Sequence, residues 1–408
     1  MALPTKIVEI GFDLTSQGGP FFTLDDEVQG VLDNPDFTLG GTLFYDVTDF
    51  VISINTDRGK SRELDRYDSG NLEVIFDNTT RVFDPLNASS PYYGQIVPHR
   101  EIRVKSNGSA VFYGLIDDWN LLYQPSGDNQ AVALASDGFT LLATQSLAAH
   151  TAVPQLTGAR INAVLSRPEV NWPLTSRNID VGTINLQGDE VSDGTGALTY
   201  LQLVEQTEGG SFFIDNAGNA TFQDTLAGPS STGLVVLTDD GTGIPFSNVS
   251  VVYGSEFLYN RVVVTRAGGD PQTAEDTNSQ NAYGISSYNL EGLLFNSDVD
   301  ALALADSLLG EYSEPEYRFD SITVQMSELT TQQQNDLLAL DLTDQIEVKF
   351  TPNNIGSQIV KYGEIIGIEH NIGIFVHELT FKLSTLDFAE FVLDDAVFGL
   401  LDTGRLGN

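Results

Sequence analysis

The sequence predicts a mainly β protein in which a small α+β segment separates two barrel-like β domains. Strand-like alternation fills the first third, helical spacing appears in the middle third, and alternation returns in the last third. The expected boundaries are 1–137 for the first barrel and 138–250 for the α+β insert. The second barrel, with one packed helix, is expected at 251–390, and a docking tail at 391–408.

Apolar and polar residues alternate with a period of two through the first part. In "NLEVIFD", Leu72, Val74 and Phe76 face one way and the residues between them face the other. "EIRVKS" repeats the pattern with Ile102 and Val104, and "SAVFYGLIDDWNLLY" and "NQAVALAS" extend it across the turn signal "QPSGDN". These segments predict antiparallel strands with one buried face.

The middle part changes to helical spacing. "DGFTLLATQSL" and "TGARINAVLSRPEV" predict two helices, and Pro168 ends the second. "GTGALTYLQLVEQTEGG" predicts a third helix with Leu201 and Val204 on its apolar face and a stop at Gly209. "SFFIDNAGNATFQD" predicts a hairpin that turns at 216–218.

Strand patterns return in the last part. They are "YNRVVVTRA", "FDSITVQM", "DQIEVKF", "VKYGEIIGIEH" and "FVHELTFKL". One helix, "SDVDALALADSLLGEYSEP", interrupts them; Ser297 and Asp300 form a cap-like start and Pro315 closes it. His370 and His377 are expected on the two strands of a hairpin.

Charge and composition exclude several classes of partner. The chain has 408 residues, 57 of them acidic and 19 basic, with a net charge of −38. Such a field repels nucleic acid and anionic membranes, so non-specific binding to either is not expected. With no cysteine there is no disulfide or thiolate metal site. No apolar run has the length needed to span a bilayer, so stable membrane insertion is not expected.

Catalytic motifs do not emerge from the sequence. It contains no nucleophile elbow, P-loop or dinucleotide fingerprint, and the four histidines are too scattered for a short metal-ligand spacing. Asp117, Asp118 and Trp119 are the one acidic-aromatic group that could line a sugar cleft, but a strand end with Trp119 covering the core is favoured. We therefore expect no enzyme activity, no cofactor and no dedicated metal site, with incidental calcium left open.

The strongest pattern is "RGKSRELDRYDSGNLEVIFDNTTRVFDPLNASSPYYGQIVPHREIRV". It resembles the N-terminal signature of minor tail proteins, the baseplate or tail-tip hub family, of long-tailed bacteriophages. The matching positions are Arg58-Gly59, Ser61, Leu64-Asp65-Arg66, Gly70, Val74, Asp77-Asn78, Arg81, Phe83-Asp84-Pro85, Asn87, Ser90-Pro91-Tyr92-Tyr93, Pro98, Arg100 and Ile102. "ALTYLQLVEQTEGGSFFIDNAGNATFQD" and the segment from "YNRVVVTRAGG" to "GEYSEP" are similar to later parts of that family.

This resemblance implies a structural virion protein. The family's hub is a trimer whose two tube-type barrel domains per chain make a pseudo-sixfold ring that continues the tail tube, with the α+β domain outside it. The implied partners are further copies of the chain, the distal tail ring protein, the tape measure protein and tail-tip or fibre proteins, with DNA passing through unbound. Two alternatives remain open: a hexameric distal tail ring protein and a tail-associated polysaccharide or cell-wall hydrolase.

Eight of the nineteen basic residues fall between Arg58 and Lys105. Pairing with acidic groups of neighbouring subunits is the functional hypothesis, and pairing within the chain is the alternative, for example Arg81 with Asp77 or Asp84. The residues assigned to an interface are Arg58, Lys60, Arg62, Tyr92, Tyr93, Arg100 and Arg103. Those assigned to holding the fold are Arg66, Arg81 and Asp84.

The excess of carboxylates has two open interpretations. An acidic lumen would repel phosphates and keep DNA mobile in a conduit. An acidic outer surface would keep the protein soluble. The sequence does not distinguish the two.

Overall fold

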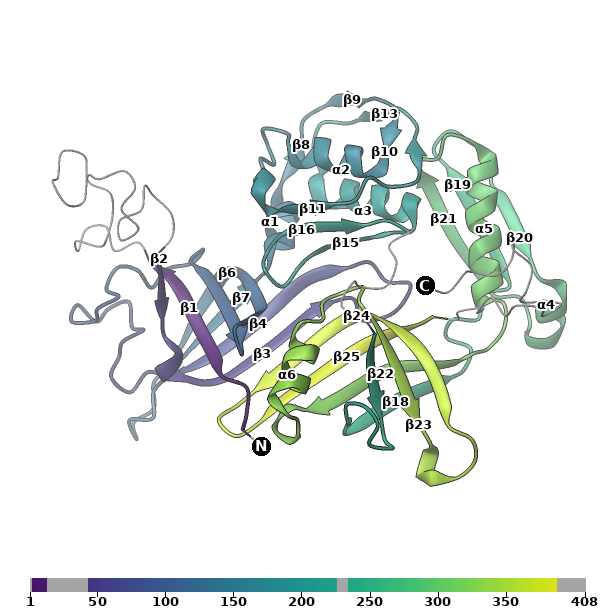
Figure 1. Cartoon of the computed structure of the whole chain (residues 1–408). Coiled ribbons are helices and arrows are strands. Elements are labelled where there is room, and N and C mark those ends of the chain that lie inside the picture. Colours follow the sequence, from purple (N-terminus) through teal and green to yellow (C-terminus); the bar gives the residue numbers. More distant parts are fainter. Residues whose placement is uncertain (1, 13–42, 226–233, 387–408) are drawn as a thin grey trace.

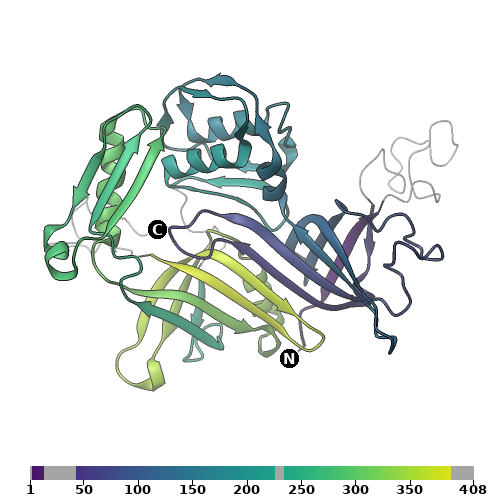
Figure 2. The ribbon, with the colours of Figure 1, turned by 180° about the vertical axis from the view of Figure 1, so that it is seen from behind.

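The computed structural model describes residues 2–12, 43–225 and 234–386. The expected docking tail at 391–408 lies outside these residues. Antiparallel strands dominate, and two α/β layers lie side by side on one side of a large sheet (Figures 1 and 2). The predicted class, mainly β with an α+β insert, is confirmed.

The large sheet contains thirteen strands from both ends of the chain. Its order is β18-β22-β25-β24-β3-β4-β7-β6-β5-β1-β2, and β23 pairs with β24 on one side and with β17 on the other. The strands are β1 (Lys6–Phe12), β2 (Leu43–Asp46), β3 (Val51–Gly59), β4 (Asp68–Asp77), β5 (Glu101–Ser106), β6 (Ser109–Leu122), β7 (Gln130–Ser136), β17 (Val235–Thr238), β18 (Asn248–Tyr253), β22 (Tyr317–Gln325), β23 (Gln345–Phe350), β24 (Ile359–Ile372) and β25 (His377–Leu386).

The two β-rich parts are joined directly rather than closed as separate barrels in the described residues. β3 pairs antiparallel with β24, from Gly59↔Gly367 to Ile54↔Ile372. A Cβ on Gly59 would collide with the Ile366 carbonyl oxygen, so this close approach requires a glycine.

The α+β insert follows β7. Its helices are α1 (Gly138–Thr144), α2 (Thr157–Leu165) and α3 (Ala197–Glu208), and β15 (Ser211–Ile214) forms the predicted hairpin with β16 (Ala220–Gln223). α3 ends as predicted at Gly209, whose φ is 74°. The shorter elements are β8 (Ser146–Leu147), β9 (His150–Ala152), β10 (Gln155–Leu156), η3 (Leu174–Ser176), β11 (Arg177–Ile179), β12 (Asn185–Leu186), β13 (Asp189–Val191) and β14 (Thr195–Gly196).

A second α/β layer stands beside the insert. The strands β19 (Arg261–Arg266), β20 (Gln272–Glu275) and β21 (Ser287–Leu293) form their own sheet, on which α5 (Asp298–Tyr312) packs. α5 begins as predicted, with the Ser297 side chain accepting from the Asp300 amide. "YNRVVVTRA" is therefore a strand as expected, but it belongs to this layer and not to the large sheet. Its apolar residues have a core of their own, built around Val262, Val264, Ala301 and Ala305.

Two helices of the described residues were not predicted from the sequence. α4 (Thr277–Tyr283) starts at Asp276, and α6 (Thr331–Leu338) starts at Thr330 with a capping box to Gln333. The Thr330-x-x-Gln333 spacing is a recognisable start signal, so α6 was detectable. The remaining short helices are η2 (Thr48–Phe50), η4 (Met326–Glu328) and η5 (Pro352–Asn354).

One continuous core joins the large sheet to the insert. Phe76 and Phe83 stack with Trp119 on the sheet, and Phe139 of α1 stacks on Phe212 of β15. The Asp137 side chain caps α1 by accepting from the Phe139 amide and also accepts from the Gly70 amide of β4. The insert is therefore seated firmly on the strands that position the basic segment.

Candidate assembly surface and its supporting joints

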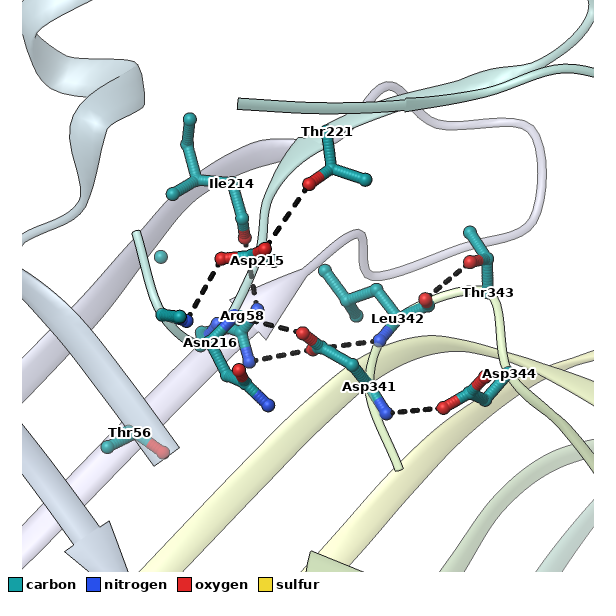
Figure 3. Close-up of polar contacts among 12 residues, drawn as sticks. Thr56, Arg58, Ile214, Asp215, Asn216, Thr221, Asp341, Leu342, Thr343 and Asp344 are labelled. Atoms are coloured by element: carbon teal, nitrogen blue, oxygen red, sulfur yellow. Dashed lines mark hydrogen bonds and ion pairs between the residues drawn. The ribbon is translucent and has the colours of Figure 1, made fainter. Parts of the chain in front are cut away.

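Arg58 lies at the end of β3, where three parts of the chain meet. Its guanidinium pairs with Asp341 Oδ1 at 2.9 Å and donates to the Ile214 carbonyl at 3.0 Å (Figure 3). The Asn216 amide donates to the other oxygen of Asp341 at 2.9 Å. Arg58 thus ties the large sheet to the β15–β16 hairpin and to the turn after α6.

The interface assignment of Arg58 is contradicted by its burial, because only 4% of the residue is exposed. Arg58 continues the alternation of Ile54 and Thr56, which are also buried in β3. That alternation was present in "VISINTDRG" and could have revealed the inward side chain. A charged guanidinium is normally expected at the solvent-exposed surface. Burial of Arg58 is tolerated because Asp341 neutralises its charge and the Ile214 carbonyl accepts a hydrogen bond from it.

The other basic residues of this segment make contacts within the chain. Lys60 Nζ lies 5.0 Å from the centre of the Tyr67 ring, and Arg66 donates to Gln206 of α3 at 3.0 Å. Arg62 pairs with Glu256 at 2.9 Å, and both side chains are well exposed. Of the three residues 58, 60 and 62, Arg62 is therefore the one most open to a neighbouring subunit.

A tight turn follows β4 at "RVFDP". Arg81 adopts a φ of 58° and pairs with Asp84 at 2.6 Å, one of the two intrachain pairings considered from the sequence. Asp84 is fully buried and also accepts from the Leu86 amide and the Tyr123 hydroxyl, both at 2.8 Å. Burial opposes the charge of Asp84, but these hydrogen bonds and Arg81 lower its pKa below the usual value.

The two tyrosines of "SPYY" point in different directions. Tyr92 is half-buried against Phe12, with ring centres 4.4 Å apart, and burial raises its pKa. Tyr93 is 50% exposed. Tyr92 therefore packs within the subunit, and Tyr93 is the one free to contact a neighbour.

The last two assigned basic residues lie near and on β5. Arg100 donates to the Gln95 carbonyl at 3.3 Å. Arg103 binds Glu9 at 2.6 Å and lies 3.8 Å from the centre of the Phe44 ring, and Glu9 also pairs with Lys105. The guanidinium and ammonium lower the pKa of Glu9 against the opposing effect of its burial. Each of these cations is thus engaged inside the chain.

The loops around the "FDP" turn carry an exposed apolar surface that the sequence analysis assigned only in part. Asp84 and Tyr123 are hydrogen-bonded across it, and the Trp119 indole donates to the Val97 carbonyl at 3.4 Å. We call this the loop-end surface. Its members are Leu86, Tyr93, Val97, Leu122 and Tyr123, which are between 39% and 83% exposed. Exposed apolar side chains at the loop end of a sheet are typical of protein contacts.

A shallow acidic groove of about 640 Å³ crosses the middle of the large sheet. Its carboxylates are Asp57, Glu73, Asp117, Glu369 and Glu378. Lys382 pairs with Asp57 and Glu369 beside it. Within the described ranges, no three histidine, aspartate or glutamate side chains converge to hold a metal, and no helix is long and apolar enough to cross a membrane.

The acidic-aromatic group Asp117, Asp118 and Trp119 lies towards the end of β6, and Trp119 and Asp117 make contacts within the fold. Trp119 stacks on Phe76 and Phe83 and so covers the core, as favoured from the sequence. Asp117 accepts a 2.5 Å hydrogen bond from Ser136. Asp117 is thus held by Ser136 in the lining of the acidic groove, which it shares with four other carboxylates.

Solved structures show which proteins share this architecture. The tail protein from Neisseria meningitidis MC58 superimposes with a TM-score of 0.59 at 11% identity, over 94% of this chain and 97% of that one. The prophage MuSo2 43 kDa tail protein from Shewanella oneidensis gives 0.58 at 12% identity, over 93% and 98%. The chain has a phage tail protein fold. No family model and no curated protein matches the sequence. The tail protein fold thus extends through both β-rich parts and the insert.

Proposed function

We propose that this chain is a structural protein of a phage virion, acting as a homotrimeric hub at the tail tip. The observation that carries the proposal is the likeness to two tail proteins over nearly the full length of both partners. Each chain contributes two β-rich parts joined at β3 and β24, so three copies would supply six such parts to a ring. A pseudo-sixfold ring of this kind matches the symmetry expected of a conduit that continues a tail tube.

The surfaces of the subunit support an assembly role. The loop-end surface offers Leu86 and Tyr93 to a neighbouring copy, with Arg62 as an additional exposed contact. The acidic groove supports passage of DNA without binding, since carboxylates repel phosphates. The proposed neighbours are further copies of the chain, the distal tail ring protein, the tape measure protein and tail-tip or fibre proteins.

Measuring the oligomer mass tests the proposal against its structural alternative. A hub predicts a particle of about three times the 44.2 kDa chain mass, and a distal tail ring predicts six times that mass. Light scattering on the purified protein, followed by cryo-electron microscopy of the tail tip, would distinguish them. A stable monomer absent from tail-tip density would refute both.

The hydrolase alternative rests on the acidic groove alone. Incubating the protein with host envelope polysaccharide and cell wall should release no fragments. Release of fragments that is lost on Asp117→Asn would instead favour an enzyme.

A further inference from the structure

The turn between β24 and β25 carries three consecutive exposed apolar residues. They are Ile374, Phe375 and Val376, and Phe375 is 89% exposed. A soluble protein rarely leaves a continuous apolar run in water, and such a run is typical of a site that contacts a partner. We call these three residues the hairpin tip.

The hairpin tip is held on a fixed turn. β24 and β25 pair up to Ile372 and His377, and the Gly373 amide donates to the Val376 carbonyl at 2.8 Å. The Lys6 ammonium donates to the Gly373 carbonyl at 3.4 Å, so a cation lies next to the tip. Because the tip is already ordered, it loses little conformational entropy when it binds a partner.

The hairpin tip lies at the same end of the large sheet as the loop-end surface. Strand pairing sets Ile372 level with Ile54 of β3 and, across β4 and β7, with Trp119 of β6. β6 continues past Trp119 to Leu122 and Tyr123 of the loop-end surface, as β24 continues past Ile372 to the tip. Both β-rich parts therefore present exposed apolar groups at one end of the sheet.

A groove of about 550 Å³ lies beside α6. Its apolar members are Val235 and Val236 of β17, Ile244 and Ala339, and Asp336 of α6 adds a carboxylate. A recess of this size and lining admits large apolar side chains. The carboxylate is also the electrostatic complement of the cation next to the hairpin tip.

The hairpin tip does not reach the groove of its own chain. β17 pairs with β23, and β23 pairs with the stretch 359–364 at the start of β24. The tip follows Ile372 at the other end of that strand, more than roughly 20 Å away at a rise of about 3.3 Å per residue. Since strand pairing fixes the tip in place, another molecule must supply the groove.

We propose that the hairpin tip of one copy docks in the groove beside α6 of the next copy, with Phe375 as the anchoring side chain. This inference rests on the proposed homotrimeric hub, because a ring of three needs contacts between two different surfaces of the chain. Copies with a net charge of −38 repel one another, but the segment 370–377 contains no acidic residue. Docking therefore joins the copies where their repulsion is weak.

Sedimentation of the full-length protein over a range of concentrations tests the docking. Phe375→Ser removes the anchor and Ala339→Trp fills the groove, so each should raise the dissociation constant of the assembly by about tenfold or more. Leu174→Ser, at an exposed site outside both surfaces, is the matched control and should assemble as the wild type. Circular dichroism checks the fold, and Gln333→Trp replaces Ala339→Trp if that variant does not fold.

An equimolar mixture of the two variants tests whether the tip and the groove meet each other. The Phe375→Ser copy keeps its groove and the Ala339→Trp copy keeps its tip, so the mixture should form a two-copy complex about tenfold tighter than either variant alone. The inference is overturned if Phe375→Ser assembles as tightly as Leu174→Ser, or if the mixture associates no more tightly than the separate variants. Either result is compatible with a wild-type trimer and leaves the proposed hub standing.

The behaviour of the wild type separates this inference from the proposed function. Assembly that depends on Phe375 but gives open chains, or a particle other than a trimer, would keep the docking contact and refute the trimeric hub. A wild type that does not self-associate would refute both. Binding to phosphatidylcholine vesicles that Phe375→Ser abolishes, with self-association unchanged, would mean that the tip contacts lipid and would overturn docking between copies.

Discussion

Arg58 and Asp341 form a buried ion pair at 2.9 Å that links the end of β3 to the turn after α6. The guanidinium also reaches the Ile214 carbonyl, so a single side chain holds the junction of the two β-rich parts and the insert. The first basic residue of the family-like segment is therefore a joint within the subunit.

Removing the carboxylate from this joint should destabilise the protein strongly. Asp341→Ala leaves the Arg58 charge buried and unpaired, for which we expect a loss of about 3–5 kcal/mol in the free energy of unfolding. Arg62→Ala removes an exposed pair and should cost about 1 kcal/mol or less. Urea unfolding measures both. Equal, small losses would mean that the Arg58 pair does not hold the junction.

Gly59 should be intolerant of a side chain. Its φ is 101°, and an added Cβ would strike the Ile366 carbonyl oxygen on the neighbouring strand. Gly59→Ala should therefore cost about 3 kcal/mol or more, from backbone strain and displacement of β24.

Gly94 provides the matched control for this prediction. It also has a positive φ, 76°, but open space around its Cβ position. Gly94→Ala should cost about 1 kcal/mol, from the backbone conformation alone. Comparable thermal unfolding midpoints for the two variants would contradict the proposed close approach.

Local features were predictable from the sequence because neighbouring residues determine them. The stop of α3 at Gly209 needs only a left-handed residue, and the Arg81–Asp84 pair spans three positions around one turn. The β3–β24 junction was not predictable in this way. It pairs Thr56 with His370, and nothing in either strand's alternation specifies so distant a partner.

The difference between local and distant contacts also explains why some residues that the sequence assigned to an interface are buried within the subunit. The alternation of β3 points Arg58 inward, but the partners that make burial tolerable are contributed by distant segments, with Ile214 156 positions away. Tyr92 and Tyr93 are adjacent in sequence, and only the packing of Phe12 and Phe83 decides which of them is buried. The exposed apolar members of the loop-end surface come from two segments distant in the sequence, 86–97 and 122–123, that the fold brings together.

Because His370 and His377 are buried, we expect the free energy of unfolding to fall in acid. They lie on β24 and β25 as expected, with His370 Nδ1 and His377 Nε2 3.0 Å apart. Burial lowers the pKa of both, that of His377 to about 4, and Arg58 and Lys6 add to the effect on His370 and His377 respectively. The unfolded histidines take up protons near 6.5 and the folded ones do not. Stability is therefore present above about 6.5 and lost as pH falls towards 4.

A histidine variant can isolate this effect. His377→Gln keeps a polar group but cannot become charged, so its loss of stability between about pH 7 and pH 5 should be smaller than in the wild type by on the order of 1 kcal/mol. His150→Gln changes a histidine for which burial is incomplete and should preserve the wild-type profile. Guanidinium unfolding at several pH values measures the difference. Parallel profiles for all three proteins would exclude the buried pair as the acid-sensitive group.

The last prediction concerns assembly through the loop-end surface. Leu86 and Tyr93 are 83% and 50% exposed, so the double change Leu86→Ser and Tyr93→Ser should leave the subunit folded. If these side chains are buried between copies, the same change should weaken the proposed trimer by about tenfold or more in its dissociation constant, because buried apolar and aromatic groups dominate such contacts.

Leu174→Ser with Tyr253→Ser is the matched control, since these residues are 77% and 69% exposed but lie outside the loop-end surface. Sedimentation of the wild type and both variants over a range of concentrations measures the oligomeric state, and circular dichroism checks the fold. Reversing the charges at 58, 60 and 62 together is unsuitable, because it would also break the buried Arg58 pair. A Leu86 and Tyr93 variant that assembles as tightly as the control would place the subunit contact elsewhere on the molecule.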